Sequence, residues 1–257
     1  MVTTEQVKEL REKTGISVMQ CKRALEEAGG DMQKAVAILK KNSAGIAEKK
    51  AGRSAKDGAV AVKHGEKKAT LVTLRCETDF VAQNSDFLSL LTRLAEIALK
   101  KGVEKMKEEA KEAIDPIIQK TGENIELGEC YEVAGDTIGS YVHGNNKIGV
   151  IVSLLGGNME LARNIAMHTA AMKPEYLSEK DISEESRNMV REIFEKETVE
   201  SGKPEEIKRK ILEGKIAAYF KEKTLLEQAF IKDSSITVGA LLDKNRAEIK
   251  EVKRSAI

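Results

Sequence analysis

Apolar residues recur at three- and four-residue spacing through residues 1–42, and this period predicts short helices that pack on one another. Polar and small residues interrupt the pattern where each helix should begin or end. The predicted starts are a capping box at Thr3 and Gln6, the same pattern at Ser17 and Gln20, and a cap at Asp31; the predicted ends are Gly15 and the pair Gly29-Gly30. The pattern therefore predicts three helices.

The core that these helices can form is small. Its predicted members are Val7, Leu10, Leu25, Val36 and Leu39. A core of this size gives only marginal stability. We therefore expect residues 1–42 to form a small, independent folding unit with a limited function. Residues 43–57 are rich in Ala, Gly, Ser and Lys, which is typical of a linker, partly helical.

Two later stretches alternate apolar and polar residues around a His-Gly pair. Residues 60–76 contain His64-Gly65, and residues 138–155 contain His143-Gly144 at the corresponding place. Each stretch predicts two strands joined by a turn, and each is followed by a helical pattern. We interpret them as two copies of one hairpin-plus-helix unit.

The two copies differ between the hairpin and the helix. The first copy fills this gap with residues 77–85, whereas the second closes it with Gly156-Gly157, before helices whose predicted caps are Asp86 and Asn158. Because the second copy manages without the longer segment, the fold does not require it. A loop of this kind on a rigid scaffold is where functional residues tend to lie.

Two long amphipathic patterns at 183–200 and 205–226 predict an antiparallel helical hairpin, joined at Ser201–Pro204. A two-helix hairpin cannot bury both sides of its apolar stripe, so we expect part of it to be a docking surface. The stripe residues are Met189, Val190 and Ile193 on the first helix and Ile207, Ile211, Leu212, Ile216 and Phe220 on the second.

The remaining segments complete an α+β fold. Residues 104–120 favour a helix with Pro116 as a break or a start, and 125–133 favour a strand or two. The last segment predicts a Thr-capped helix and an edge strand. The predicted domains are 1–42, the linker 43–57, a first core subdomain 58–135, a second core subdomain 136–182 with 227–257, and the helical hairpin 183–226.

Composition excludes several classes of protein. The chain has 43 Lys and Arg against 42 Asp and Glu, whereas a general nucleic-acid binder needs a sustained basic surplus. We therefore expect no direct nucleic-acid contact, although the linker lysines leave an RNA-binding accessory as a weaker alternative. There is no long apolar run and no apolar segment at the N-terminus, so we expect no membrane contact and a cytoplasmic location.

No catalytic constellation is visible. Phosphate-loop, dinucleotide, zinc-protease and nucleophile-elbow motifs are absent, and three histidines (His64, His143 and His168) are scattered. Three cysteines, Cys21, Cys76 and Cys130, are widely spaced, which suits a reducing compartment, and we expect Cys76 to be a small core residue. We therefore expect that the chain is not an enzyme and that it binds neither a cofactor nor a metal ion.

Several motifs together resemble one family. They are Thr78-Asp79-Phe80-Val81, GENI at 122–125, GSYVHG at 139–144, IAMHTAAMKPEYL at 165–177, SGKP at 201–204, TVGALL at 237–242 and the opening VKELREKTG with CKRALEEAGGD. In this order they resemble the elongation factor Ts family, guanine-nucleotide exchange factors of elongation factor Tu in bacterial translation. The chain departs from the family at Val18-Met19, at Gln20, at Thr121 and in its last residues, 251–257.

The resemblance implies a mechanism and a set of contact residues. It implies that the chain binds elongation factor Tu with GDP and promotes release by displacing the magnesium ion. The residues implied for this step are Thr78, Asp79, Phe80 and Val81; those implied for secondary contacts are Thr121, Gly122, His143, Gly144, Val18 and Met19. It also implies an N-terminal module similar to ubiquitin-associated domains and a coiled-coil-like insertion, which agrees with residues 183–226. Three options stay open for this helical hairpin: it pairs with a second copy to form a homodimer, packs on its own core, or contacts the partner.

Other interpretations stay open at this point. On residue type alone Phe80 would be a core residue, and its place in the inserted loop favours an exposed wedge instead. His168 is either a packing residue or a contact for a partner domain. A ubiquitin-associated-like binding scaffold without exchange activity is the alternative function.

Overall fold

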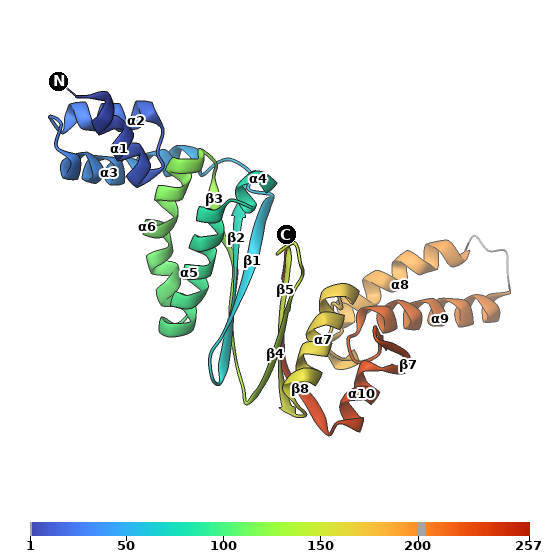
Figure 1. Ribbon diagram of the computed structural model, residues 1–257. Helices are drawn as coiled ribbons and strands as arrows, with labels where there is room; N and C mark the ends of the chain where they lie inside the picture. The colour runs from blue at the N-terminus through green and yellow to red at the C-terminus, as the bar shows by residue number, and fades with distance from the viewer. Residues whose placement is uncertain (1, 200–203) are drawn as a thin grey trace. The chain divides into compact units, whose positions relative to one another are not determined.

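The structure is a computed structural model that describes residues 2–199 and 204–257 (Figure 1). The chain divides into two units. Unit 1 comprises Met1–Ala134, Val142–Ile151 and Lys253–Ile257, and unit 2 comprises Gly135–Tyr141 and Val152–Val252. The predicted α+β class is confirmed. No helix in the described ranges is long and apolar enough to cross a membrane.

Unit 1 begins with three helices: α1 (Thr4–Thr14), α2 (Val18–Glu27) and α3 (Met32–Lys50). The Thr3–Gln6 capping box forms in full, Gly15 ends α1 with a φ of 68°, and Asp31 caps α3. At Ser17 only half of the predicted box forms, because Ser17 accepts from the Gln20 amide while the Gln20 side chain binds elsewhere. The other predicted starts and ends are confirmed, except that α3 runs past residue 42.

The small core of these helices differs from the prediction at Val36. Val36 is 41% exposed, because Ala35 and Leu39, one turn apart, take the inward face of α3. The helix also continues to Lys50, so residues 43–50 of the predicted linker are helical. Ala47 is buried in the same cluster as residues of α6, so this part of the linker is packed rather than loose.

The first hairpin copy forms a three-stranded antiparallel sheet in the order β1-β2-β3. Figure 1 shows α5 and α6 packed on this sheet. The elements are β1 (Asp57–His64), β2 (Lys68–Cys76), α4 (Asp79–Ala82), α5 (Ser85–Lys101), α6 (Val103–Thr121) and β3 (Ile125–Ala134). The core between sheet and helices is aliphatic apart from Phe87 and includes Cys76, as predicted. The inserted residues therefore lie between the end of β2 and the start of α5.

Two local predictions in unit 1 are wrong. The cap of α5 is Asn84 rather than Asp86, because the Asn84 side chain accepts from the Asp86 amide. Pro116 neither breaks nor starts α6, which runs through it from Val103 to Thr121. Proline removes one backbone bond of the helix, but the buried face on both sides of it, including Ile114 and Ile118, keeps α6 continuous.

The second copy contributes a sheet in the order β4-β5-β8 and a helix capped by Asn158, as predicted. Its elements are β4 (Thr137–Val142), β5 (Ile148–Gly156), α7 (Met159–Met172), the 3-10 helix η1 (Glu179–Asp181), β6 (Ala229–Phe230), β7 (Asp233–Thr237), α10 (Val238–Lys244) and β8 (Ala247–Ala256). Thr237 caps α10 and β8 is an edge strand, so both predictions for the last segment are confirmed.

The two long helices of unit 2 are α8 (Glu184–Val199) and α9 (Glu205–Lys223), which lie side by side in Figure 1. They are antiparallel, since Arg187 lies over the Phe220 ring and Glu197 pairs with Lys215. The predicted joining turn at residues 201–203 lies outside the described residues. The predicted stripe of α8 divides. Val190 is buried in one cluster with Phe220, and Phe194, one turn further on, packs against the same cluster. Met189 and Ile193 lie outside this inward face and are 60% and 54% exposed.

Candidate functional site

The inserted segment forms a short turn around Phe80, which we call the Phe80 turn (residues 77–84). Thr78 is the cap of α4, and its hydroxyl accepts a hydrogen bond from the Val81 amide at 3.4 Å. Ala82 is buried and Val81 partly buried against the core, while Asp79 is exposed and the Phe80 side chain is 83% exposed. The turn therefore presents an aromatic ring and a carboxylate to solvent.

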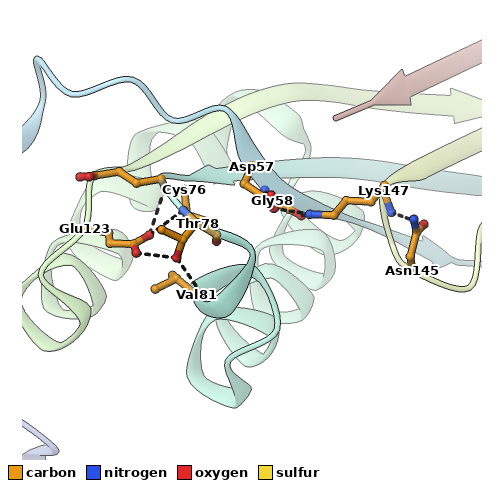
Figure 2. A network of polar contacts seen from close by, with 9 residues as sticks. Asp57, Gly58, Cys76, Thr78, Val81, Glu123, Asn145 and Lys147 are labelled. Carbon is orange, nitrogen blue, oxygen red and sulfur yellow. Dashed lines mark hydrogen bonds and ion pairs between the residues drawn. The ribbon is translucent and has the colours of Figure 1, made fainter.

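Glu123 holds the start of this turn. One carboxylate oxygen accepts from the Glu77 amide at 3.1 Å and from the Thr78 amide at 3.0 Å, and the other accepts from the Thr78 hydroxyl at 2.6 Å. Figure 2 shows the Glu123 carboxylate pointing toward Thr78, with these hydrogen bonds as dashed lines. The segment after α6 and the segment after β2 are thus fastened to each other by one side chain.

A second set of bonds ties the same two segments together in the opposite direction. The Glu77 carboxylate accepts from the Asn124 amide at 2.7 Å, and Arg53 lies 3.6 Å from it. The Asn124 side chain also donates to the Arg53 carbonyl at 2.8 Å. Glu77 and Glu123 therefore each bind a backbone amide of the other segment.

Thr121 and Gly122 lie next to Glu123 at the end of α6. Gly122 adopts a φ of 76°, which closes the helix with a bond from its amide to the Ile118 carbonyl. The Lys50 ammonium donates to the Gly122 carbonyl, and the Thr121 hydroxyl donates to the Ile117 carbonyl at 2.8 Å. The structure thus brings the predicted pair Thr121-Gly122 close to the Phe80 turn through Glu123.

The turn that carries His143 and Gly144 connects to the same end of the first sheet. His143 and Gly144 are exposed, and Lys147 at the end of the turn pairs with Asp57 and donates to the Gly58 carbonyl at 2.8 Å. Asp57 is the register partner of Cys76, two residues before Thr78. Figure 2 shows both groups of contacts at this end of the strands.

Two pKa values reflect this network. Burial by itself raises the pKa of the Asp57 carboxyl, but the bonds from Lys147 and from the Gly58 amide hold that pKa below its ordinary value. Burial, with the negative charges of Glu123 and Asp57, raises the pKa of the Cys76 thiol to about 12. Cys76 is thus protonated near neutral pH, and a thiol in this state is a poor nucleophile.

Val18 and Met19 lie on the first turn of α2 and are 45% and 58% exposed. The next residue, Gln20, accepts a hydrogen bond from the Gln119 side chain of α6 at 2.9 Å. Lys120 of α6 lies against Gly15 and pairs with Asp86. The last turn of α6 thus contacts the N-terminal helices through Gln119 and Lys120. The chain then continues through Gly122 into Glu123.

His168 is a packing residue, which resolves the two options left by the sequence. It is fully buried, its Nε2 lies 2.9 Å from Gln228 Oε1, and its Nδ1 accepts from the Ile231 amide at 3.2 Å. Among the described residues, no group of three or more His, Cys, Asp and Glu side chains has the arrangement of a metal site.

The sequence reasoning missed Glu123 as a functional residue. It lies in the GENI stretch that supported the resemblance, but a glutamate after a helix-ending glycine has no distinctive spacing. It also missed Lys147 and Lys120, which are single lysines in a chain with many. Their roles follow from pairing with residues far away in the chain, for which the sequence carries no local signal.

The comparisons with known proteins agree on one family. The model of the family described as Elongation factor TS matches residues 77–257. A protein of Hahella chejuensis named Elongation factor Ts is 43% identical, covering 98% of this chain and 91% of that protein. Proteins of the same name from Pseudomonas fluorescens and Deinococcus deserti are 43% and 39% identical and cover 100% and 93% of this chain, and 90% and 94% of their own lengths. This chain therefore belongs to the elongation factor Ts family and is a translation elongation factor.

Proposed function

We propose that this chain binds elongation factor Tu in its GDP form and promotes the exchange of GDP for GTP by displacing the magnesium ion. The observation that carries the proposal is the Phe80 turn, in which an 83% exposed phenylalanine projects from a segment fastened at its start. An exposed aromatic ring on a fixed turn is a feature that a partner is expected to cover. The family supplies the identity of the partner.

The physical requirement for exchange is a difference in binding, without covalent chemistry. A factor that binds the nucleotide-free partner more tightly than the GDP form weakens GDP binding by the same ratio, because the two equilibria are linked. Magnesium and the phosphate loop hold GDP in such partners. A side chain that inserts near the ion only when GDP is released supplies the difference.

Within this proposal the residues of the turn have separate tasks. Phe80 is the wedge, because it is the exposed apolar group of the turn. Asp79, beside it, brings a carboxylate that competes with or repels the acidic and hydroxyl groups around the magnesium ion. Thr78 and Val81 shape the turn, Thr78 through Glu123 and Val81 through its packing on the core.

The other implied residues act as secondary contacts. The His143-Gly144 turn and Thr121-Gly122 are assigned to the same G domain. Lys147, at the end of the first of these, bonds to β1, which pairs with β2. Thr121 accepts from the amide of Glu123, which holds the start of the Phe80 turn. Val18 and Met19 are assigned to docking, because they form an exposed apolar pair on α2. We place this activity in the cytoplasm, where translation takes place.

The test is the release of a fluorescent GDP derivative from elongation factor Tu, with excess unlabelled GDP, at increasing concentrations of this protein. The proposal expects the release rate to rise to a plateau and the acceleration to depend on the magnesium concentration. No acceleration at a concentration where binding is observed would leave the alternative, a ubiquitin-associated-like binding scaffold without exchange activity.

A further inference from the structure

The Phe80 turn is too short to fix its own orientation by helical hydrogen bonds alone. α4 is four residues long, far below the ~12–15 residues at which isolated helices become marginally stable. Val81 and Ala82 hold its inner side against the core, and the Cys76 thiol donates to the Thr78 carbonyl at 3.1 Å; the side-chain hydrogen bonds that link the turn to distant segments of unit 1 lie at Glu77 and Thr78. The direction in which Phe80 projects therefore depends on what holds the start of the turn.

Glu123 holds that start with both of its carboxylate oxygens. Three donors converge on them from Glu77 and Thr78 at 2.6–3.1 Å. Hydrogen bonds to an ionised carboxylate are about twice as strong as neutral ones. The Thr78 hydroxyl that donates to Glu123 also accepts from the Val81 amide, so the same oxygen orders the first turn of α4.

Glu123 is itself held in place. The residue before it, Gly122, closes α6 in the left-handed conformation, and the residue after it donates its amide to Glu77. The Asn124 side chain reaches the Arg53 carbonyl. The carboxylate is therefore presented from a loop fixed on both sides, so it can impose its geometry on the Phe80 turn.

We infer that Glu123 is the positioning residue of the exchange step: it does not touch the partner, but it sets the direction of Phe80 through Thr78. This inference rests on the proposed function. Glu123 and its donors are only partly buried, so loss of the carboxylate leaves amides that water can reach. A Glu123 variant is therefore expected to fold and to loosen only the turn.

The experiment compares Glu123→Ala, Glu123→Gln and the control Glu132→Ala. Glu132 is a carboxylate of the same unit that makes one ordinary ion pair with Lys68 at 3.2 Å. For each protein, the plateau rate of GDP release from elongation factor Tu, the half-maximal concentration and the melting temperature are measured. Glu123→Ala is expected to lower the plateau roughly tenfold, equivalent to ~1.4 kcal/mol of barrier, with little change in melting. Glu123→Gln, which keeps one acceptor, is expected to be intermediate, and Glu132→Ala to match the parent.

A second comparison separates positioning from a general structural role. The Glu123→Ala change is repeated in a Phe80→Ala background, because residues that act as a unit have non-additive effects. The inference expects no further loss of plateau rate there. An unchanged plateau in Glu123→Ala, or an equal loss in both backgrounds, would overturn it. If the parent protein itself fails to accelerate release, the proposed function fails instead, and the two failures are distinguishable.

Discussion

His168 Nε2 lies 2.9 Å from the side-chain oxygen of Gln228 in the interior of unit 2, and His168 Nδ1 accepts from the Ile231 amide. Because Nδ1 is an acceptor, the proton of the neutral ring is on Nε2, which donates to Gln228. The Gln228 amide group in turn donates to the Glu222 carbonyl at 2.7 Å and to the Met172 carbonyl at 3.4 Å. One neutral histidine therefore helps to join the end of α7 to the end of α9, at the base of the helical hairpin.

This arrangement predicts a loss of stability in weak acid. Burial lowers the pKa of His168 below the ordinary value of 6.5, so the unfolded chain binds the proton more readily than the folded one. The contribution of the neutral His168 ring to the free energy of unfolding is therefore fully present above the ordinary pKa, and it is lost as the pH falls below that value. We expect the melting temperature to fall below about pH 6.5, and His168→Gln to flatten this dependence while lowering stability at neutral pH.

His64 is the second histidine whose titration can contribute to this pH dependence. Partial desolvation of the ring lowers the pKa of His64 as well, but the residue is exposed at the surface, so its contribution has the same sign and should be the smaller of the two. Melting curves from about pH 7.5 to about pH 5, a range that brackets the ordinary histidine pKa, are measured on the parent, His168→Gln and His64→Gln. They are expected to assign the larger part of the slope to His168, which is fully buried. An unchanged slope in His168→Gln would contradict the assignment.

The proposed docking role of Val18 and Met19 predicts an effect on affinity rather than on the exchange step. Both side chains are exposed, so Val18→Ser with Met19→Ser should leave stability within about 0.5 kcal/mol of the parent. We expect the half-maximal concentration for GDP release to rise severalfold while the plateau rate is kept. A lowered plateau with an unchanged half-maximal concentration would assign the pair to the exchange step instead.

The role proposed for Asp79 predicts an effect on GDP release that depends on the magnesium concentration. Its carboxylate is exposed, and its proposed target is the surroundings of the magnesium ion. Asp79→Asn is expected to slow GDP release less than loss of Phe80 does, and the defect is expected to change with magnesium concentration because the interaction is electrostatic. Release rates across a magnesium titration test this, with Glu132→Ala, a carboxylate of the same unit outside the turn, as the control.

The exposed apolar residues of the helical hairpin predict a second docking surface. Met189, Ile193 and Ile207 are 60%, 54% and 46% exposed, which is more apolar surface than a solvated hairpin needs. If the hairpin pairs with a second copy, Met189→Glu with Ile193→Glu is expected to lower the sedimentation mass at a concentration where the parent dimerises. Lys196→Glu, which makes the same change in net charge at a polar position of α8, serves as the control. A parent that sediments as a monomer at all concentrations contradicts the dimer.

The sequence predicted most elements because their signals are local. Caps such as Thr3 and Asp31 act on residues three positions away, and the repeat of hairpins follows from a period of two. The predictions for Pro116 and Val36 are wrong because the packing of the whole helix decides where such residues lie. Glu123 was missed because its partner, Thr78, lies far from it in the chain, and only the folded register brings the two together.

Phe80 and Phe87 offer a matched test of the wedge. The two phenylalanines belong to consecutive helices, yet Phe80 is 83% exposed and Phe87 is fully buried in the core under the first sheet. Phe87→Ala should cost about 3–5 kcal/mol of stability, because it leaves a cavity. Phe80→Ala removes the same atoms from a solvated position, so its melting temperature should stay close to that of the parent.

The two variants should differ in the opposite way in activity. Phe80→Ala is expected to lower the plateau rate of GDP release by roughly tenfold or more, the effect of ~1.4 kcal/mol or more on the barrier. Phe87→Ala, measured at a temperature where it remains folded, is expected to keep most of the rate per folded molecule. Melting and release are measured on the same preparations. A Phe80→Ala protein that melts much earlier and releases GDP at the normal rate per folded molecule would make Phe80 a structural residue and remove the wedge from the mechanism.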